Sequence, residues 1–480
     1  MDAKAPLPTA GSYSQALRVL AEQVFSRAGG APLVAGNAVD LLIDGRANFD
    51  AWLAAIRGAT TAILFENYIF RDDELAHEFL DALVERATAG VRVHVIRDWL
   101  GCLGQSGSGF WQPLLDAGGE VRVYNPPRFA SPFGWLARDH RKLLVIDGAI
   151  GFLGGICVSA RWLGNPARGI APWRDTGIAV RGPAVRDLVA AFADIWQQLG
   201  AALPEDLSAM VDNELLSGRV DLRVVATVPN LATLYRMEQL IAAMARRTLW
   251  MTDAYYIGVA PHVQALAAAA RDGVDVRLLV PGSSDVPAVG ALSRAGYRPL
   301  LEAGVRVFEW NGSMLHAKTA VADARWARVG SSNLNIASWI GNCELDVTIE
   351  DQAFAQRMEA QYLADLDNAT EIVLSERRRV RLEKTAGSGR RKMQGGSSGR
   401  AAAGALRLAN TMGAAVSNRR VLGSSESGIL LAGAVLLVAL ALLAAIWPRI
   451  VAWPLAVIAC WIGLSLLARY VGARRQRPHS

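Results

Sequence analysis

Cysteine is scarce in this chain of 480 residues, and its four cysteines form no C-x-x-C pair (Cys102, Cys157, Cys343 and Cys460). Isolated cysteines argue against a structural zinc site and against a disulfide framework, and they fit a reducing compartment. The segment from Met1 to Leu20 also lacks a continuous apolar run. The sequence therefore predicts no signal peptide.

Lysine and histidine are scarce as well, and their positions carry the strongest signal in the sequence. Only five of the 50 basic residues are lysines, and there are six histidines. The pattern H-x-K-x-x-x-x-D occurs twice with identical internal spacing, at His140, Lys142, Asp147, His316, Lys318 and Asp323. Because nearly every other cation is arginine, the two lysines indicate positions that need a compact, mobile ammonium group. We interpret the duplicated pattern as a functional site.

Acidic residues are few toward the C-terminus, and this divides the chain by charge. Residues 375–427 hold 12 Lys/Arg and 3 Asp/Glu, and residues 428–480 hold 5 arginines and no acid. These segments carry net charges of +9 and +5 out of a total of +6, which leaves −8 for Met1 to Leu374. A nucleic-acid enzyme is expected to surround its active site with positive charge. The acidic body that carries the motifs therefore argues against nucleic acid as the partner.

Two long apolar runs close the sequence, in a chain that is 52% hydrophobic. The runs Ile429 to Trp447 and Ile450 to Leu467 contain no charged residue and are separated by Pro448-Arg449. Each run is about long enough to cross a bilayer, so we predict a transmembrane helical hairpin with both ends on one side. Arginines flank both ends and only Arg449 lies at the tip. The positive-inside rule therefore places the body and the C-terminus in the cytoplasm.

The body repeats itself beyond the motif. Strand-like segments follow helical ones in both parts, as in Ala89–Asp98 and Asp272–Pro281. This alternation indicates α/β architecture, and the repeat indicates two halves related by a pseudo-twofold axis. Alternation along a strand would place the histidine and lysine of each motif on one face. We predict a first half at 1–215, a second half at 216–374, a basic linker at 375–427 and the hairpin with a basic tail at 428–480.

The linker is rich in Gly, Ser and Arg, which is typical of a solvated connection. Alternatively, its arginines lie on anionic lipid headgroups and hold the body near the membrane surface.

Two ammonium groups and two imidazoles around one point suit the chemistry of a phosphodiester. The lysines would neutralise the non-bridging oxygens and stabilise charge in the transition state. One neutral imidazole would attack phosphorus, and the other, protonated, would donate to the leaving alkoxide. The intermediate would be a phosphohistidine that passes to water or to another alcohol. This chemistry requires no metal, and the sequence shows no cluster that looks like a metal site.

At these residues the chain resembles the phospholipase D superfamily, whose signature is the duplicated H-x-K-x(4)-D pattern. Within it, the chain resembles the bacterial cardiolipin synthase branch between Gly36 and Ile349, in the segments GNAVDLLIDG, ENYIFRDDELAHEF, WRDTGIAVRGPAV, LLVPGSSDVPAV, GSSNLN and NCEL. The resemblance implies two phospholipase D-like α/β/α domains with mixed sheets, phospholipid substrates and no cofactor.

The resemblance also implies roles for the motif residues. His140 becomes the nucleophile and His316 the general acid, while the lysines of both motifs hold phosphate oxygens. The two motif aspartates, Asp147 and Asp323, are counted with the site, although we expect them to support the fold rather than to touch phosphate.

Three further residues match the family pattern. Asp175 in WRDT and Glu344 in NCEL fall where the family places carboxylates that orient the two imidazoles. Such a carboxylate accepts from Nδ1–H, leaves Nε2 free and stabilises the imidazolium cation. Asn333, in GSSNLN after the second motif, matches a phosphate-contacting asparagine, whereas Cys157 stands at the equivalent position after the first motif. A thiol is a weaker hydrogen-bond donor than an amide, so we expect a lopsided site.

Together these features predict a membrane-anchored phosphatidyltransferase of the bacterial inner membrane, with its catalytic body in the cytoplasm. The branch resemblance favours a cardiolipin synthase that condenses two phosphatidylglycerols into cardiolipin and glycerol. The alternative is a phospholipase D-type hydrolase, or a transphosphatidylase that uses phosphatidylethanolamine or another alcohol. A non-catalytic scaffold is a third reading, against which the intact histidines, lysines and acids argue. The sequence leaves the oligomeric state open.

Overall fold

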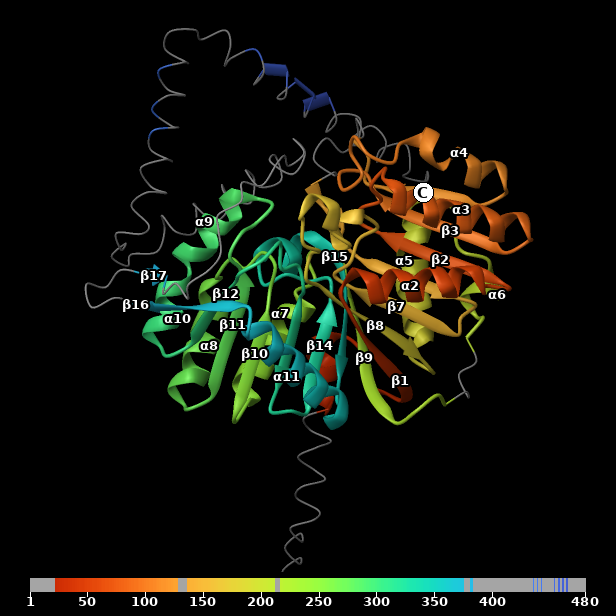
Figure 1. Ribbon diagram of the computed structural model, residues 1–480. Coiled ribbons are helices and arrows are strands. Elements are labelled where there is room, and N and C mark those ends of the chain that lie inside the picture. Colours follow the sequence, from red (N-terminus) through yellow and green to blue (C-terminus); the bar gives the residue numbers. More distant parts are fainter. Residues whose placement is uncertain are drawn as a thin grey trace, which may run out of the picture.

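The structure is a computed structural model that describes residues 22–127, 136–211, 216–374 and 380–382, with isolated positions between 435 and 464. It contains two α/β halves that lie side by side (Figure 1). The first half is coloured red to yellow and the second green to cyan. The prediction of two α/β halves from one repeated sequence is therefore confirmed.

The first half is built on a mixed sheet in the order β4-β3-β2-β6-β7-β8-β1. The strands β2, β3 and β4 run parallel, and every other neighbouring pair is antiparallel. The strand bounds are β1 Val34–Ile43, β2 Ala62–Asn67, β3 Arg92–Asp98, β4 Glu120–Tyr124, β6 Lys142–Ile146, β7 Ile150–Gly154 and β8 Thr176–Arg181. Every residue of β2 is buried, as expected of a strand covered on both faces.

The second half repeats this order as β12-β11-β10-β13-β14-β15-β9 and adds β16 and β17 beyond β12. Its strand bounds are β9 Val220–Thr227, β10 Thr248–Thr252, β11 Asp275–Pro281, β12 Arg306–Trp310, β13 Thr319–Ala322, β14 Trp326–Gly330, β15 Asn342–Ile349, β16 Ala369–Leu374 and β17 Val380–Leu382. The two motifs therefore occupy equivalent places in the two sheets. The first motif leads into β6, and the second leads into β13.

Helices cover both sheets and define three cores. The outer face of the first sheet packs against α2 Asp44–Arg57, α3 Glu74–Thr88 and α4 Ser108–Asp116. The outer face of the second packs against α7 Thr233–Met244, α8 Ala260–Arg271 and α10 Tyr297–Glu302, with α9 Pro287–Ala295 beside them. The short helix α6 Glu205–Ser208 follows α5 Val185–Gln198. Helices α5 and α11 Gln352–Leu366 share the third, central core with strands of both halves.

The two halves are also joined through backbone pairing. Strand β1 pairs antiparallel with β9 of the second half, and the short strand β5 Arg138–Asp139 pairs in parallel with the start of β15. An isolated parallel bridge between Arg174 and Leu315 makes the equivalent contact in the opposite direction. Because these pairings fix the halves against each other, residues of one half can complete a site in the other.

Among the described residues, no helix is long and apolar enough to cross a membrane. The predicted hairpin and basic tail, residues 428–480, and the linker, residues 375–427, lie outside the described residues apart from β17 and the isolated positions. The hairpin and its orientation therefore stay predictions.

Candidate active site

The histidines of both motifs lie where the two halves meet. His140 precedes β6 and His316 precedes β13, so the expectation that the histidines belong to these strands is wrong. The reason is that each histidine backbone pairs with the opposite half. The N–H of His140 donates to the carbonyl of Cys343 at 2.9 Å, and that of His316 donates to the carbonyl of Arg174 at 2.7 Å.

The motif aspartates lie at the far ends of the same strands. Asp147 accepts from the backbone amides of Thr60, Thr61 and Ala62 at 2.8 to 2.9 Å. Asp323 accepts from the backbone amides of residues 246–248 at 2.7 to 2.9 Å. These contacts hold the chain that enters β2 and β10, and they do not reach the histidines.

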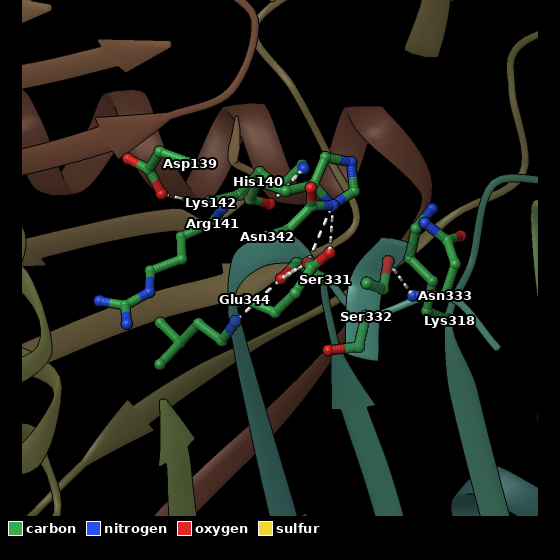
Figure 2. Close-up of polar contacts among 12 residues, drawn as sticks. Asp139, His140, Arg141, Lys142, Lys318, Ser331, Ser332, Asn333, Asn342 and Glu344 are labelled. Carbon is green, nitrogen blue, oxygen red and sulfur yellow. Dashed lines mark hydrogen bonds and ion pairs between the residues drawn. The ribbon is translucent and has the colours of Figure 1, made fainter. Parts of the chain in front are cut away.

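The first histidine is oriented by a carboxylate of the second half (Figure 2). His140 Nδ1 lies 2.9 Å from Glu344 Oε2, and both side chains are buried. Ser331 Oγ donates to the same oxygen at 2.6 Å, and Asn342 Nδ2 donates to Oε1 at 3.0 Å. Because Nδ1 faces the carboxylate, Nε2 is the nitrogen that is directed away from Glu344.

The second histidine is oriented by a carboxylate of the first half. His316 Nδ1 lies 2.8 Å from Asp175 Oδ2, and Trp162 Nε1 donates to that oxygen at 2.8 Å. Gly155 occupies the position after the first motif that matches Ser331 after the second. A Cβ at Gly155 would lie 2.3 Å from Asp175 Oδ1, so glycine is required for the carboxylate to approach. The two pairs are thus equivalent in position but different in their support.

The lysines bring positive charge to both histidines. Lys142 Nζ donates to the carbonyl of His140 at 2.5 Å. Lys318 Nζ lies 3.0 Å from His316 Nδ1 and 3.2 Å from Nε2. Each ammonium also faces a tyrosine ring, at 5.0 Å from the centre of Tyr68 and 5.8 Å from that of Tyr255.

The charged groups of the two halves act on one another. Burial, together with the charge of Lys318 and more weakly that of Lys142, lowers the pKa of His316 to about 4. Burial, aided by Lys142 and opposed by Asp175, lowers the pKa of Lys318 to about 8. The charge of Lys142 therefore acts across the boundary between the halves.

The two orienting acids differ in how firmly they are ionised. Burial raises the pKa of Glu344, although Lys142 and the donors Ser331 and Asn342 oppose this. Burial would also raise the pKa of Asp175, but the His316 interaction, Lys318 and Trp162 outweigh it and lower the pKa. Asp175 is therefore the more firmly ionised of the two.

The position of Asn333 is matched by Cys157, as the spacing predicted. Asn333 is buried and its Oδ1 has no hydrogen-bond partner within the described part of the chain. Cys157 is also buried, and burial raises the pKa of its thiol although Lys142 and Lys318 both act to lower it. Both lysines thus act on the thiol, which remains protonated at neutral pH.

Sequence reasoning missed residues outside the motifs that act on the motif side chains. Asp253, just after β10, is buried and accepts from the amides of Tyr255 at 2.9 Å and Leu334 at 2.7 Å. Its charge raises the pKa of Lys318. The counterpart of Asp253 in the first half is Asn67. Each lies at the same distance from the first residue of its strand, Thr248 or Ala62, whose backbone amide donates to the motif aspartate. Alignment of the two repeats was therefore the sequence signal that could have found Asp253.

Three aromatic rings surround His316. Trp162, Trp173 and Tyr255 lie with ring centres 5.2, 5.7 and 5.7 Å from the imidazole. His140 lies near the ring of Tyr68, at 4.8 Å between ring centres. Among the described residues no group of three His, Cys, Asp or Glu is arranged to hold a metal ion.

Two halves of one topology, each supplying a His–Lys pair and the carboxylate for the other half's histidine, define an enzyme of the phospholipase D superfamily, of the phosphatidyltransferase kind. Comparison with known proteins agrees. The family described as "Cardiolipin synthase, PLD-like domain" matches residues 52–165 and 239–366. The chain belongs to this family.

Similar sequences support this placement, and one solved structure shares the fold. The chain is 35% identical over 369 residues to cardiolipin synthase A of Pseudomonas fluorescens (strain SBW25), which covers 75% of this chain and 74% of that one. It is 35% identical over 356 residues to cardiolipin synthase A of Pseudomonas aeruginosa (strain LESB58), in an alignment that covers 73% of this chain and 71% of that one. Phosphatidylserine synthase of Haemophilus influenzae Rd KW20 shares the fold, with a TM-score of 0.58 and 15% identity over 73% of this chain and 91% of that one.

Proposed function

We propose that this protein is a cardiolipin synthase that condenses two phosphatidylglycerols into cardiolipin and glycerol. The observation that carries the proposal is the crossed pairing of His140 with Glu344 and of His316 with Asp175. It holds each imidazole at Nδ1 by a carboxylate of the opposite half, and a two-step transfer through a phosphohistidine requires two imidazoles oriented in this way. The cardiolipin synthase relatives supply the substrate class.

In the first step, His140 Nε2 attacks the phosphorus of the donor lipid. A P–N bond forms, the P–O bond to the headgroup glycerol breaks, and His316 gives its proton to the departing alkoxide. Lys142 and Lys318 hold the non-bridging oxygens, where negative charge develops. In the second step, a hydroxyl of the acceptor lipid gives its proton to His316 and attacks phosphorus. The P–N bond then breaks and His140 is restored.

The pKa of His316 is low because burial and the charge of Lys318 favour the neutral imidazole. A bound phosphodiester places negative charge between the two lysines and offsets their effect, so binding raises the pKa of His316. The proposed role of His316 as general acid requires this rise in its pKa.

We also propose roles and boundaries that the residues above support. Asn333 contacts a phosphate oxygen, and Cys157 leaves the opposite side without an equivalent amide. The catalytic halves extend over residues 1–215 and 216–374, and Asp147 and Asp323 serve them structurally. The basic linker and the hairpin, residues 375–427 and 428–480, anchor the body to the cytoplasmic face of a bacterial inner membrane.

The test uses the purified full-length protein in mixed micelles with labelled phosphatidylglycerol, followed by mass spectrometry of the lipids. We expect cardiolipin and free glycerol, both absent with His140→Ala. Phosphatidic acid alone would identify water as the acceptor and the protein as a phospholipase D-type hydrolase. Product only after addition of phosphatidylethanolamine or another alcohol would identify a different transphosphatidylase.

A further inference from the structure

The strongest departure from the pseudo-twofold is a loop beside His316. The segment from Cys157 to Asp175 is longer than the matching segment from Asn333 to Glu344. The first half therefore has an insertion between matched positions of the site. A phosphodiester presents similar oxygens to both halves, but its two alcohol sides differ in every step of the reaction. A loop that is inserted in one half only can contact one of these alcohols and not the other.

The inserted loop is ordered around two tryptophans that face the imidazole. It contains the 3-10 turns Ala160–Trp162 and Pro166–Arg168, and it closes on itself through Asn165 and Ile170. Trp162 and Trp173 pack together with ring centres 4.8 Å apart. Trp162 is buried against Asp175 and His316, whereas Trp173 is only partly buried. The loop therefore continues from the general acid toward the solvent.

The exposed part of this loop is basic and apolar. Residues 158–174 contain three arginines and no acid, while the matching residues 334–343 contain no charged residue. Arg174 is buried in an ion pair with Asp365, whereas Arg161 is half-buried and Arg168 is exposed. The Arg161 guanidinium carbon lies 5.5 Å from the centre of the Trp173 ring, and Ile170 is 52% exposed.

We propose that this loop, residues 160–173, binds the phosphate of the acceptor lipid, with Arg161 as its principal contact and Arg168 at the outer edge. The proposal rests on the proposed function, in which His316 serves the incoming alcohol. The acceptor phosphatidylglycerol differs from water and from short alcohols by a second phosphodiester anion beyond its glycerol. Arginine is suited to such an anion because its guanidinium matches phosphate oxygens with two parallel hydrogen bonds.

The distances allow one acceptor to reach both groups. Trp173 bridges the gap, since its ring centre lies 5.7 Å from that of His316 and 5.5 Å from the Arg161 guanidinium carbon. A three-carbon glycerol spans roughly 5 Å, and a hydrogen bond at each end adds ~3 Å. These distances keep the His316 ring centre within about 11 Å of the Arg161 guanidinium carbon, a separation that the glycerol with its two hydrogen bonds can span. The reacting hydroxyl can meet His316 Nε2 while the acceptor's own phosphate meets Arg161.

The chemical step is the second transfer, with the acceptor now held at two points. The hydroxyl O–H bond breaks and its proton passes to His316, while a P–O bond forms and the P–N bond to His140 breaks. Anchoring the acceptor phosphate raises the local concentration of this one alcohol over water. The loop thus decides how the phosphohistidine is divided between cardiolipin and phosphatidic acid.

The experiment measures this division in wild type and in the double variant Arg161→Gln/Arg168→Gln. Full-length protein in mixed micelles receives phosphatidylglycerol alone, or phosphatidylglycerol with excess ethanol as a neutral acceptor. We expect the ratio of cardiolipin to phosphatidic acid to fall at least about tenfold in the variant, the effect of losing charge-assisted hydrogen bonds. Phosphatidylethanol formation, which needs no acceptor phosphate, should stay within about twofold of wild type.

Controls separate this role from a general defect. Arg271→Gln changes an exposed arginine at the end of α8 and should leave the ratio unchanged, and Arg161→Lys should restore part of it by returning the charge. Equal loss of cardiolipin and phosphatidylethanol would overturn the proposal, because the loop would then serve the donor or the micelle surface. An unchanged ratio would overturn it as well. A wild type that makes no cardiolipin would instead refute the proposed function.

Discussion

Lys318 provides a sharp test of the site, because its charge is predicted to disappear within a usable pH range. The structure lowers its pKa from 10.5 to about 8, through burial and the nearby Lys142. At pH 9 an amine with a pKa of 8 is only ~10% protonated, whereas an ordinary lysine is still ~97% protonated. If the ammonium form is required to hold a phosphate oxygen, kcat/KM falls with rising pH above 8, approaching tenfold for each further pH unit.

The measurement is the initial rate of phosphatidylglycerol turnover between pH 6.5 and 10.5, in wild type and in Asp253→Asn. The carboxylate of Asp253 raises the pKa of Lys318, so its removal should move the alkaline limb to lower pH. Asparagine already stands at the equivalent position 67, which makes this a mild change of shape. The matched control Asp272→Asn alters an exposed acid at the end of α8 and should leave the limb in place.

The stability of the fold distinguishes this limb from alkaline unfolding. Between pH 8 and 10.5 the unfolded chain binds more protons at Lys318 than the folded one, so this lysine makes the folded state more stable as pH rises. Loss of activity at pH 9 should therefore occur without a matching loss in the Tm of the protein. A limb above pH 10, or one that does not move in Asp253→Asn, would refute the assigned role of Lys318.

Further predictions concern the shared site and the anchor. His140→Ala and His316→Ala should each reduce turnover by at least ~10³-fold, and a near-normal rate in either would contradict a single shared site. Glu344→Gln should lower kcat more than KM because it misorients His140; a change confined to KM would point to substrate binding instead. Truncation after Leu374 should release the protein from membranes in flotation assays but retain activity on detergent-dispersed lipid, and a body that stays bound would show a second anchor. EDTA should leave the rate unchanged, since the two lysines supply the positive charge, and strict loss of activity would require a metal.

The sequence was informative about the site because one half repeats the pattern of the other. The constant offset between the motifs identified the histidines and lysines, and matched strand segments predicted two α/β halves. Both signals are local patterns repeated along the chain, so they can be recognised without knowing how the halves meet. The family resemblance added Asp175, Glu344 and Asn333 through the local patterns WRDT, NCEL and GSSNLN.

Only the tertiary structure decided which partners these residues take. Each histidine pairs with the carboxylate of the opposite half, because β5 joins β15 and Arg174 bridges to Leu315 across the boundary. No spacing within one half encodes that exchange. The histidines also lie outside the strands that alternation had assigned to them, since their backbone hydrogen bonds leave the sheet for the other half.

The same holds for the residues outside the motifs that act on the site. Asp253 acts on Lys318, and Trp162 on Asp175, through burial and contacts between distant segments. Burial is the largest influence on the pKa values of His316 and Lys318, and burial is a property of packing rather than of residue type. The sequence by itself determined which chemical groups the protein carries and that they occur in two copies. The folded structure determined their pairing, their charge and the asymmetry between the two sides of one site.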